Sequence, residues 1–385
     1  DPDVTWLLDY GEIHIIPHAN PDGRVIAEQG QWWRKNVNNA DGCSGENPFF
    51  SGYGVDLNRN SDFMWNGCTS GSCSSDNACS PVYRGASPMS EPETQALQTY
   101  ARSIFPDQRD DDLSAAAPAD ATGLFVSLHS YGGLVLYPWG WSDTPTANED
   151  ALRALAVKLA QPLGYSACRP GECLYKTDGT NDDWLYGELG VAAFTIELGR
   201  YFFEPCSTFE GAMLEDANEA LTIAFKSSRM PYTLAAGPQA ELLHLSPARI
   251  QPGTPISITA SISPGGVSDG FGQSSLGLRY SLDVPSWIEG ALTITKTATA
   301  TAETTTPVAV TAGVDTSEWT LGRHLLIVEG SDDAGRVGLP VAAWVDVVDR
   351  ALAFELNPAL TSGTAEPGKT IAYTLILTNT GVLTD

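Results

Sequence analysis

The sequence is poor in basic residues and has no long apolar run. Its 385 residues contain 47 acidic side chains against 21 basic ones, which gives a formal net charge of −26 at pH 7. A surface this negative repels the phosphates of nucleic acids and anionic lipids, so we expect neither nucleic acid nor a charged membrane as a partner. No apolar run is long enough for a helix that crosses a bilayer, so the sequence predicts no membrane span in this chain.

The chain also lacks a starting methionine and a signal peptide. Its first residue, Asp1, stands inside what reads as a folded segment, and its last residues, 378–385, stop in the middle of a pattern. We therefore expect both ends to be cut from a longer protein, in which case a missing targeting sequence excludes no compartment. The length suffices for two or three domains with a buried core.

Tight Cys-x-x-Cys pairs are missing as well, although all seven cysteines lie within the first 206 residues. Cys68 and Cys73 are five positions apart, as are Cys168 and Cys173, and each interval suits a small loop closed by a disulfide. Such bridges form in oxidising compartments, so we expect a secreted or extracellular protein, with attachment to a cell surface as an open alternative. The odd number of cysteines leaves one over.

Strand and helix patterns alternate within residues 1–232. Residues 20–23, Asn-Pro-Asp-Gly, read as a turn, and residues 90–93, Ser-Glu-Pro-Glu, read as a capping box that opens a helix. The predicted strands are 13–17, 123–129, 134–137 and 191–198, and the predicted helices are 90–104, 147–163 and 210–228. This alternation predicts an α/β domain with a mixed, largely parallel sheet flanked by helices.

The composition changes after residue 232. Short β-rich runs separated by Gly, Pro and Ser turns fill residues 236–349, at 256–262, 276–282, 291–296, 325–328 and 342–348. This spacing predicts an antiparallel β-sandwich, and its last strands resemble those of bacterial immunoglobulin-like modules. Residues 350–385 resemble the start of a further β repeat domain of bacterial surface proteins, and we expect that domain to be incomplete.

Two strand ends of the first domain carry residues suited to catalysis. His129 ends an apolar strand and precedes a glycine pair, the place where side chains enter the ligand crevice of an α/β sheet. Glu197 ends a buried strand, where loss of hydration would raise its pKa toward that of a general base. Taken alone, such a histidine is more often structural, and such a glutamate is more often capped or ion-paired.

Two arginine patches are suited to binding negative charge. Asn58 and Arg59 leave a strand together, and a guanidinium binds a carboxylate through two parallel hydrogen bonds. That chemistry suits the free C-terminus of a peptide. Arg34, in Trp-Arg-Lys-Asn, would alone be read as a surface charge.

Together these patches, in this order and approximate spacing, resemble the funnelin-type zinc carboxypeptidases, especially the bacterial and pancreatic-like extracellular members, and we expect a secreted bacterial type. The resemblance covers Asp1 to Arg229. It implies that His129 is the third zinc ligand and Glu197 the general base that activates the zinc-bound water. It further implies that Arg34 stabilises the oxyanion. Asn58 and Arg59 would then grip the terminal carboxylate of the substrate.

The resemblance also implies a specificity pocket. Tyr175 matches the mobile tyrosine that closes over the substrate carboxylate, and Tyr131 matches a tyrosine of the upstream subsite. Asp182 stands where relatives that remove Arg or Lys carry the residue at the pocket base. Leu136 and Gly140 would line the same pocket. We therefore expect release of single C-terminal Arg or Lys residues; the alternative is that Asp182 faces solvent.

One part of the family pattern is missing. The first two zinc ligands of the family come from a His-x-x-Glu motif, and none of the five histidines here is followed three residues later by Glu or Asp. His14 and His18 are four positions apart, but His14 lies in the predicted strand at 13–17 and Pro17 precedes His18, so the two do not share a helix face and we interpret them as structural. The expected cofactor is one zinc ion, which requires a segment absent from this chain. We attribute the loss to truncation rather than to a pseudoenzyme, and expect the chain alone to be inactive.

Two other functions compete with this one. The first is an amidase of the same fold that acts on cell-wall peptides. The second is a non-catalytic surface binding protein whose β modules do the work, although a binding module needs no general base such as Glu197. The expected partners are peptide or protein C-termini, with the β modules contacting a cell surface or matrix.

Overall fold

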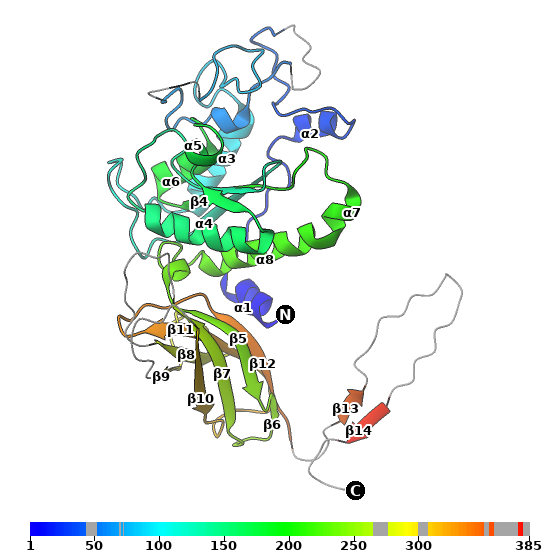
Figure 1. Cartoon of the computed structure of the whole chain (residues 1–385), viewed down its shortest axis with the longest axis vertical. Helices are drawn as coiled ribbons and strands as arrows, with labels where there is room; N and C mark the ends of the chain where they lie inside the picture. Colours follow the sequence, from blue (N-terminus) through cyan, green and yellow to red (C-terminus); the bar gives the residue numbers. More distant parts are fainter. Residues whose placement is uncertain are drawn as a thin grey trace, which may run out of the picture.

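The computed structural model describes residues 1–43, 52–68, 71, 73–264, 276–298, 307–349, 354–357 and 376–379. Figure 1 shows an α/β part above and a β part below. The α/β part contains α1 (Pro2–Tyr10), α2 (Pro21–Ala27), η1 (Leu57–Arg59), α3 (Pro92–Ile104), β1 (Leu124–His129), β2 (Leu134–Leu136), α4 (Glu149–Leu163), β3 (Ser166–Cys168), α5 (Pro170–Cys173), α6 (Asn181–Leu189), β4 (Ala192–Glu197), α7 (Cys206–Thr208), η2 (Phe209–Met213), α8 (Leu214–Ser227) and η3 (Leu234–Ala236).

A four-stranded sheet in the order β1-β4-β2-β3 forms the centre of the α/β part. β1 is parallel to β4 and β2 is parallel to β3, whereas β2 is antiparallel to β4. Helices α4 and α8 lie below this sheet in Figure 1, and α3 and α6 lie above it. Leu152, Leu155 and Leu159 of α4 are fully buried, because their spacing places them on one helix face. The predicted mixed α/β sheet with helices is confirmed.

The first seventeen residues differ from the prediction. Residues 11–16 form neither helix nor strand, so the strand predicted at 13–17 is wrong. No described strand pairs with this segment, and Ile15 is 78% exposed. An apolar run becomes a strand only where a neighbouring backbone supplies hydrogen bonds. Helix α1, capped by the Asp1 side chain, was not predicted.

The structure also differs from the prediction at two local motifs, the turn at 20–23 and the capping box at 90–93. Asn20 does not simply start a turn: its side chain accepts a hydrogen bond from Gly23 N and caps helix α2. Helix α3 forms as predicted, but its N-cap is Glu91, which makes no side-chain cap hydrogen bond. The Glu91 carboxylate instead accepts hydrogen bonds from Asn36 and Asn38. The capping box at 90–93 is therefore wrong, because a tertiary contact takes the side chain.

The two predicted disulfides are present. Cys68 is bonded to Cys73, and Cys168 to Cys173. A third bridge that was not predicted joins Cys43 to Cys79, across 36 residues. Cys206 is the cysteine left over, and it is exposed. Among the described residues, no helix combines the length and apolar character needed to cross a membrane.

The β part contains two sheets around one hydrophobic core. One sheet has the order β10-β7-β5 and the other β6-β12-β11-β8-β9. Alternate residues of β7 are buried, as expected for a strand with one face on a core. The strands are β5 (Gln239–Ser246), β6 (Arg249–Ile250), β7 (Ile256–Ser263), β8 (Leu276–Leu282), β9 (Thr293–Ala298), β10 (Val308–Val314), β11 (Gly322–Asp332) and β12 (Val341–Val347). Of these, β5, β6 and β10 were not predicted.

Little of the last predicted unit is described. β13 (Phe354–Asn357) and β14 (Ile376–Asn379) form an antiparallel pair. The remainder of 350–385, which was predicted to begin a repeat domain, lies outside the described residues.

Helix α1 lies between the two parts of the chain (Figure 1). Trp6 and Leu7 are buried against Leu325 and Ile327 of β11, and the Trp6 ring meets the Trp287 ring edge-on at 5.4 Å. Asp3 accepts hydrogen bonds from Lys226 of α8 at 2.7 Å and from Ala342 N of β12 at 2.9 Å. The β part is therefore packed against the α/β part through a shared apolar cluster.

His324 predicts a pH dependence of stability in the β part. Its Nδ1 lies 2.7 Å from Asp283 Oδ2 and its Nε2 lies 2.8 Å from Thr320 O, so both ring nitrogens face acceptors. Burial lowers the pKa of His324, but these acceptors outweigh burial and raise it above 6.5. A raised folded-state pKa contributes stability below the unfolded pKa, and that stability is lost as pH rises through the folded pKa.

We expect the melting temperature to fall as pH rises above about 6.5 through the folded pKa of His324, and we expect His324→Gln to reduce this dependence. The matched control is His244→Gln, at an exposed histidine of β5. Thermal unfolding followed by circular dichroism at several pH values measures the effect. An unchanged pH profile in His324→Gln contradicts the assignment.

Candidate active site

The two predicted catalytic strand ends lie side by side. β1 and β4 are parallel, and His129 and Glu197 are register partners at their last positions. Parallel neighbours end at the same edge of a sheet, so both residues lie at the same edge of this one. The backbone continues this pairing, since Leu198 N donates to His129 O at 2.8 Å.

Burial shifts the pKa of both residues. It raises the pKa of Glu197 to about 7, although Arg34 and Arg59 act in the opposite direction; Asp182 adds a smaller upward effect. Burial also lowers the pKa of His129 to about 4, assisted by Arg34. His129 is therefore neutral near pH 7, the form in which imidazole binds metals. Its Nε2 lies 3.0 Å from Ser127 Oγ.

Arg34 is held in the site by a carboxylate that sequence reasoning missed. Its Nε and Nη2 lie 2.9 and 2.8 Å from Asp56 Oδ2. Asp56 is buried, and its other oxygen accepts the backbone N–H of Asn58, which caps the short helix η1. Asp56 thus links the two arginine patches. The sequence signal that could have identified Asp56 is its position two residues before the predicted binding residue Asn58.

Arg59 is buried and oriented by backbone acceptors. Its Nη1 donates to Asn58 O at 2.6 Å and its Nε to Cys73 O at 3.2 Å. Its Nη2 donates to Tyr175 Oη at 3.2 Å, and the Tyr175 ring lies 5.9 Å from the guanidinium carbon. Tyr175 is itself 44% exposed. The predicted carboxylate-binding arginine and the predicted closing tyrosine are therefore in contact.

Asn58, the neighbour of Arg59 on η1, connects this helix to α6. Its side-chain oxygen accepts the backbone N–H of Asn181, the first residue of α6, at 3.0 Å. The next residue of α6, Asp182, is 5% exposed, so it does not face solvent. Asp182 Oδ2 accepts from Thr195 Oγ1 at 3.2 Å.

Two predicted pocket residues lie on β2 and on the loop after it: Leu136 ends β2, and Gly140 follows four residues later. Leu136 is buried and is the register partner of Thr195. Gly140 N donates to both carboxylate oxygens of Asp183, at 2.9 and 3.0 Å. A Cβ on Gly140 would lie 2.3 Å from Thr177 Oγ1, so any larger residue would displace this wall. Burial, with the neighbouring Asp182, raises the pKa of Asp183 well above its ordinary value.

Tyr131 lies outside this buried group. It follows His129 by two residues and is 45% exposed. Its ring meets the Phe202 ring at 4.8 Å, and Phe202 also meets Trp32 at 5.0 Å. An aromatic wall of this kind is suited to contact apolar parts of a peptide.

The described residues do not by themselves fit a catalytic zinc site. Three protein ligands are needed, and His129 is the one predicted ligand present. His14 is engaged elsewhere: its Nδ1 lies 2.7 Å from Tyr100 Oη and its Nε2 lies 3.0 Å from Glu12. His18 lines a separate cavity of about 420 Å³ together with Ile15, Ile16 and Tyr100.

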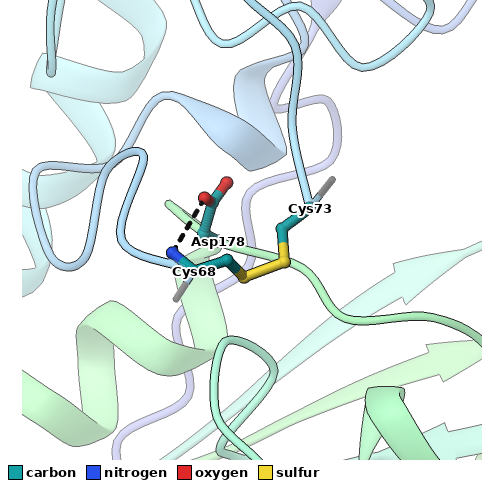
Figure 2. Close-up of side chains that lie close together, drawn as sticks. All are labelled: Cys68, Cys73 and Asp178. Atoms are coloured by element: carbon teal, nitrogen blue, oxygen red, sulfur yellow. Dashed lines mark hydrogen bonds between the residues drawn. A yellow bond between two sulfur atoms is a disulfide. The ribbon is translucent and has the colours of Figure 1, made fainter. Parts of the chain in front are cut away.

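A second group of potential metal ligands lies nearby but is chemically different. Cys68, Cys73 and Asp178 bring their ligand atoms within 4.8 Å of one another (Figure 2). The two sulfurs are joined in a disulfide, and a disulfide sulfur is not the thiolate that binds metals. This group therefore does not complete the site of His129.

Comparison with known proteins gives a consistent match to the first part of the chain. The zinc carboxypeptidase family model matches residues 1–219. A metallocarboxypeptidase A-like protein of Trichophyton verrucosum is 34% identical over 212 residues, which cover 51% of this chain and 44% of that protein. Carboxypeptidase A4 of Mus musculus is 33% identical over 205 residues, covering 51% and 43%. The chain spans about half the length of these relatives or less.

Solved structures also resemble this chain. The structure of bovine thrombin-activatable fibrinolysis inhibitor, in complex with a tick carboxypeptidase inhibitor, is 24% identical to this chain. It covers 58% of this chain and 71% of its own, with a TM-score of 0.47.

Proposed function

The chain belongs to the zinc carboxypeptidase family, and from this premise we propose that its active site releases single residues from the C-termini of peptides. The observation that carries the proposal is one shared site: His129 and Glu197 end paired parallel strands, and Arg34 and Arg59 each lower the pKa of both residues. A base, an oxyanion-binding cation and a carboxylate-binding cation are what this hydrolysis requires.

Each residue has a role in this proposal. Glu197, with its pKa raised to about 7, takes a proton from the attacking water and returns it to the leaving amine. Arg34, fixed by Asp56, stabilises the negative oxygen of the tetrahedral intermediate. Arg59 binds the terminal carboxylate of the substrate. The carboxylate either replaces the Tyr175 hydroxyl as the acceptor of the Arg59 Nη2 hydrogen bond or shares this donor with it.

Zinc is the cofactor that the family implies. His129, neutral near pH 7, is the candidate ligand in this chain. We propose that the other two ligands come from a His-x-x-Glu segment, which the 385 residues do not contain. The chain of 385 residues is then inactive alone, since one imidazole is too few ligands for a catalytic zinc ion.

We further propose that the enzyme prefers C-terminal Arg or Lys. Asp182 is buried beside Thr195, and a buried carboxylate is costly until a cation pairs with it. The relatives matched include a metallocarboxypeptidase A-like protein and carboxypeptidase A4, and their names do not include a preference for Arg or Lys. Leu136 and Gly140 would line the same pocket.

Asp182→Asn tests the preference. In a polypeptide that also carries a His-x-x-Glu segment, we expect kcat/KM for a peptide ending in Arg to fall by roughly 10- to 150-fold, since a hydrogen-bonded charge contributes about 1.5–3 kcal/mol. Hydrolysis of the same peptide ending in Leu should change little, and it serves as the internal control. Equal losses for both peptides would contradict a charge-reading role of Asp182.

The domain organisation is part of the proposal. We assign residues 1–232 to the catalytic domain, residues 236–349 to an immunoglobulin-like β-sandwich and residues 350–385 to the start of another β unit. The two sheets and single core of the β part support the sandwich assignment. We propose a secreted protein of the bacterial type, in agreement with three disulfides in the first part.

One experiment separates this function from its competitors. Peptides ending in Arg, with a free or an amidated C-terminus, are incubated with a polypeptide extended by a His-x-x-Glu segment, and the products are identified by mass spectrometry. The proposal predicts loss of one residue from the free acid and none from the amide. Cleavage specific to a diaminopimelate-type centre would favour the wall-peptide amidase, and binding without cleavage would favour a binding protein.

A further inference from the structure

The disulfide between Cys68 and Cys73 lies next to Arg59 of the proposed substrate site. Cys73 is 3% exposed, and its carbonyl oxygen accepts the hydrogen bond from Arg59 Nε at 3.2 Å. The position of that carbonyl sets the direction of the guanidinium plane, because Arg presents its donors in a fixed planar fork. The remaining donor group, Nη2, faces Tyr175.

Cys68 is tied to two other walls of the same site. Its backbone N–H lies 3.5 Å from Asp178 Oδ2 (Figure 2), and its sulfur lies 3.4 Å from Trp141 O. Asp178 stands between Tyr175 and Asp182 in the chain, and Trp141 follows the pocket residue Gly140. The bridge therefore joins three segments that carry proposed substrate-binding residues.

Asp178 is a buried carboxylate with an incomplete set of partners. It is 2% exposed, and its Oδ1 has no hydrogen-bond partner among the described residues. The adjacent backbone packs tightly, since a Cβ on Gly179 would lie 2.4 Å from Arg59 O. Leaving a carboxylate oxygen unpaired in such a place costs free energy. Asp178 therefore keeps this position only because the surrounding packing holds it against the bridge.

We propose that the Cys68–Cys73 disulfide, anchored by Asp178, is a positioning element for Arg59 and so for recognition of the substrate's terminal carboxylate. This inference rests on the proposed function, because it takes Arg59 as the carboxylate-binding group. Loss of the bridge frees the Cys73 carbonyl to move, and the guanidinium then loses its alignment with a carboxylate.

The test is a binding measurement on the chain of 385 residues, and it needs no zinc. A short peptide ending in Arg and the same peptide with an amidated C-terminus are titrated separately, and ligand-observed NMR gives both dissociation constants. We expect the wild-type chain to bind the acid at least 10-fold tighter than the amide, because a hydrogen bond to a charged group contributes about 1.5–3 kcal/mol.

The double variant Cys68→Ser, Cys73→Ser should lower this acid-over-amide ratio by about threefold or more while binding the amide as before. The control is Cys43→Ser, Cys79→Ser, which removes another bridge of the same segment and should keep the ratio. If the first double variant does not fold, the variant Asp178→Ala, which keeps both cysteines, serves as the test. Its acid-over-amide binding ratio should also fall, and an unchanged ratio would overturn the inference.

An unchanged ratio in a folded Cys68→Ser, Cys73→Ser variant overturns the inference. Equal weakening of the acid and the amide overturns it as well, because that result marks a general structural role. A wild-type chain that binds acid and amide equally contradicts the proposed function itself, and is thereby distinguished from failure of the positioning role alone.

Discussion

Replacing Glu197 by Gln is expected to lower kcat/KM by about 10²- to 10⁴-fold in a polypeptide that also carries a His-x-x-Glu segment. Glutamine keeps the shape of the side chain but accepts no proton. The residues that pair with Glu197 on the neighbouring strands are His129 and Leu134, so neither described neighbour offers a carboxylate that could act as the base in its place. The rate of release of C-terminal Arg from a peptide measures the effect.

A matched control uses the same chemical change at the surface. Glu188→Gln removes a half-exposed carboxylate that pairs with Arg102 at 2.8 Å on α6 and α3. We expect its kcat/KM to stay within about twofold, because an exposed ion pair contributes little. A Glu197→Gln variant that retained wild-type activity would exclude Glu197 as the general base.

Replacing Glu329 by Ala is expected to destabilise the protein by about 3 kcal/mol, because it removes the buried carboxylate that two partly buried arginines share. Glu329 is 1% exposed; its Oε1 lies 2.5 Å from Arg229 and its Oε2 lies 2.7 Å from Arg279. Arg229, which follows α8, also stacks on Trp287 at 4.0 Å. The loss therefore falls on the junction between the α/β part and the β part.

Urea unfolding monitored by tryptophan fluorescence measures this loss. Asp346→Ala is the control, since it breaks the exposed pair with Arg323 on β11 and β12 and should cost below about 1 kcal/mol. Burial lowers the pKa of Arg229 to about 10, with Glu329 opposing that effect, which agrees with a cation that depends on this carboxylate. Equal stability of the two variants would contradict the junction's role.

Short-range patterns predicted much of the α/β part. The strand runs that became β1 and β4 are apolar and end in chemically distinctive residues, His129 and Glu197, and the amphipathic spacing of α4 placed its leucines correctly. The five-residue cysteine intervals predicted their bridges because the loops close locally. In each case the signal lies within a few consecutive residues.

Long-range partners were harder to predict. The Cys43–Cys79 bridge spans 36 residues, and no spacing rule selects it from the other pairings. Asp56 pairs with Arg34 across 22 positions, and Glu91 caps no helix because Asn36 reaches it from 55 positions away. The strand predicted at 13–17 fails for the same reason: pairing with another strand, which local sequence does not encode, decides its state.

The β part shows where pattern strength limits prediction. β7 alternates strictly between buried and less buried residues and was predicted, whereas β10, Val-Ala-Val-Thr-Ala-Gly-Val, is rich in small residues and was missed. β5 is bent by a register shift between Glu241 and His244, which interrupts its alternation. Irregular or weakly apolar strands are recognised only once their neighbours are known.

The most direct test of the central claim compares the chain of 385 residues with a polypeptide that is extended by a His-x-x-Glu segment of the zinc carboxypeptidase family. Zinc content is measured by atomic emission, and release of C-terminal Arg is measured in the same samples. The account predicts about one zinc ion per extended polypeptide with activity, and neither in the shorter chain, since His129 alone is too few ligands. Full zinc occupancy and activity in the shorter chain, or an extended polypeptide with neither, would contradict it.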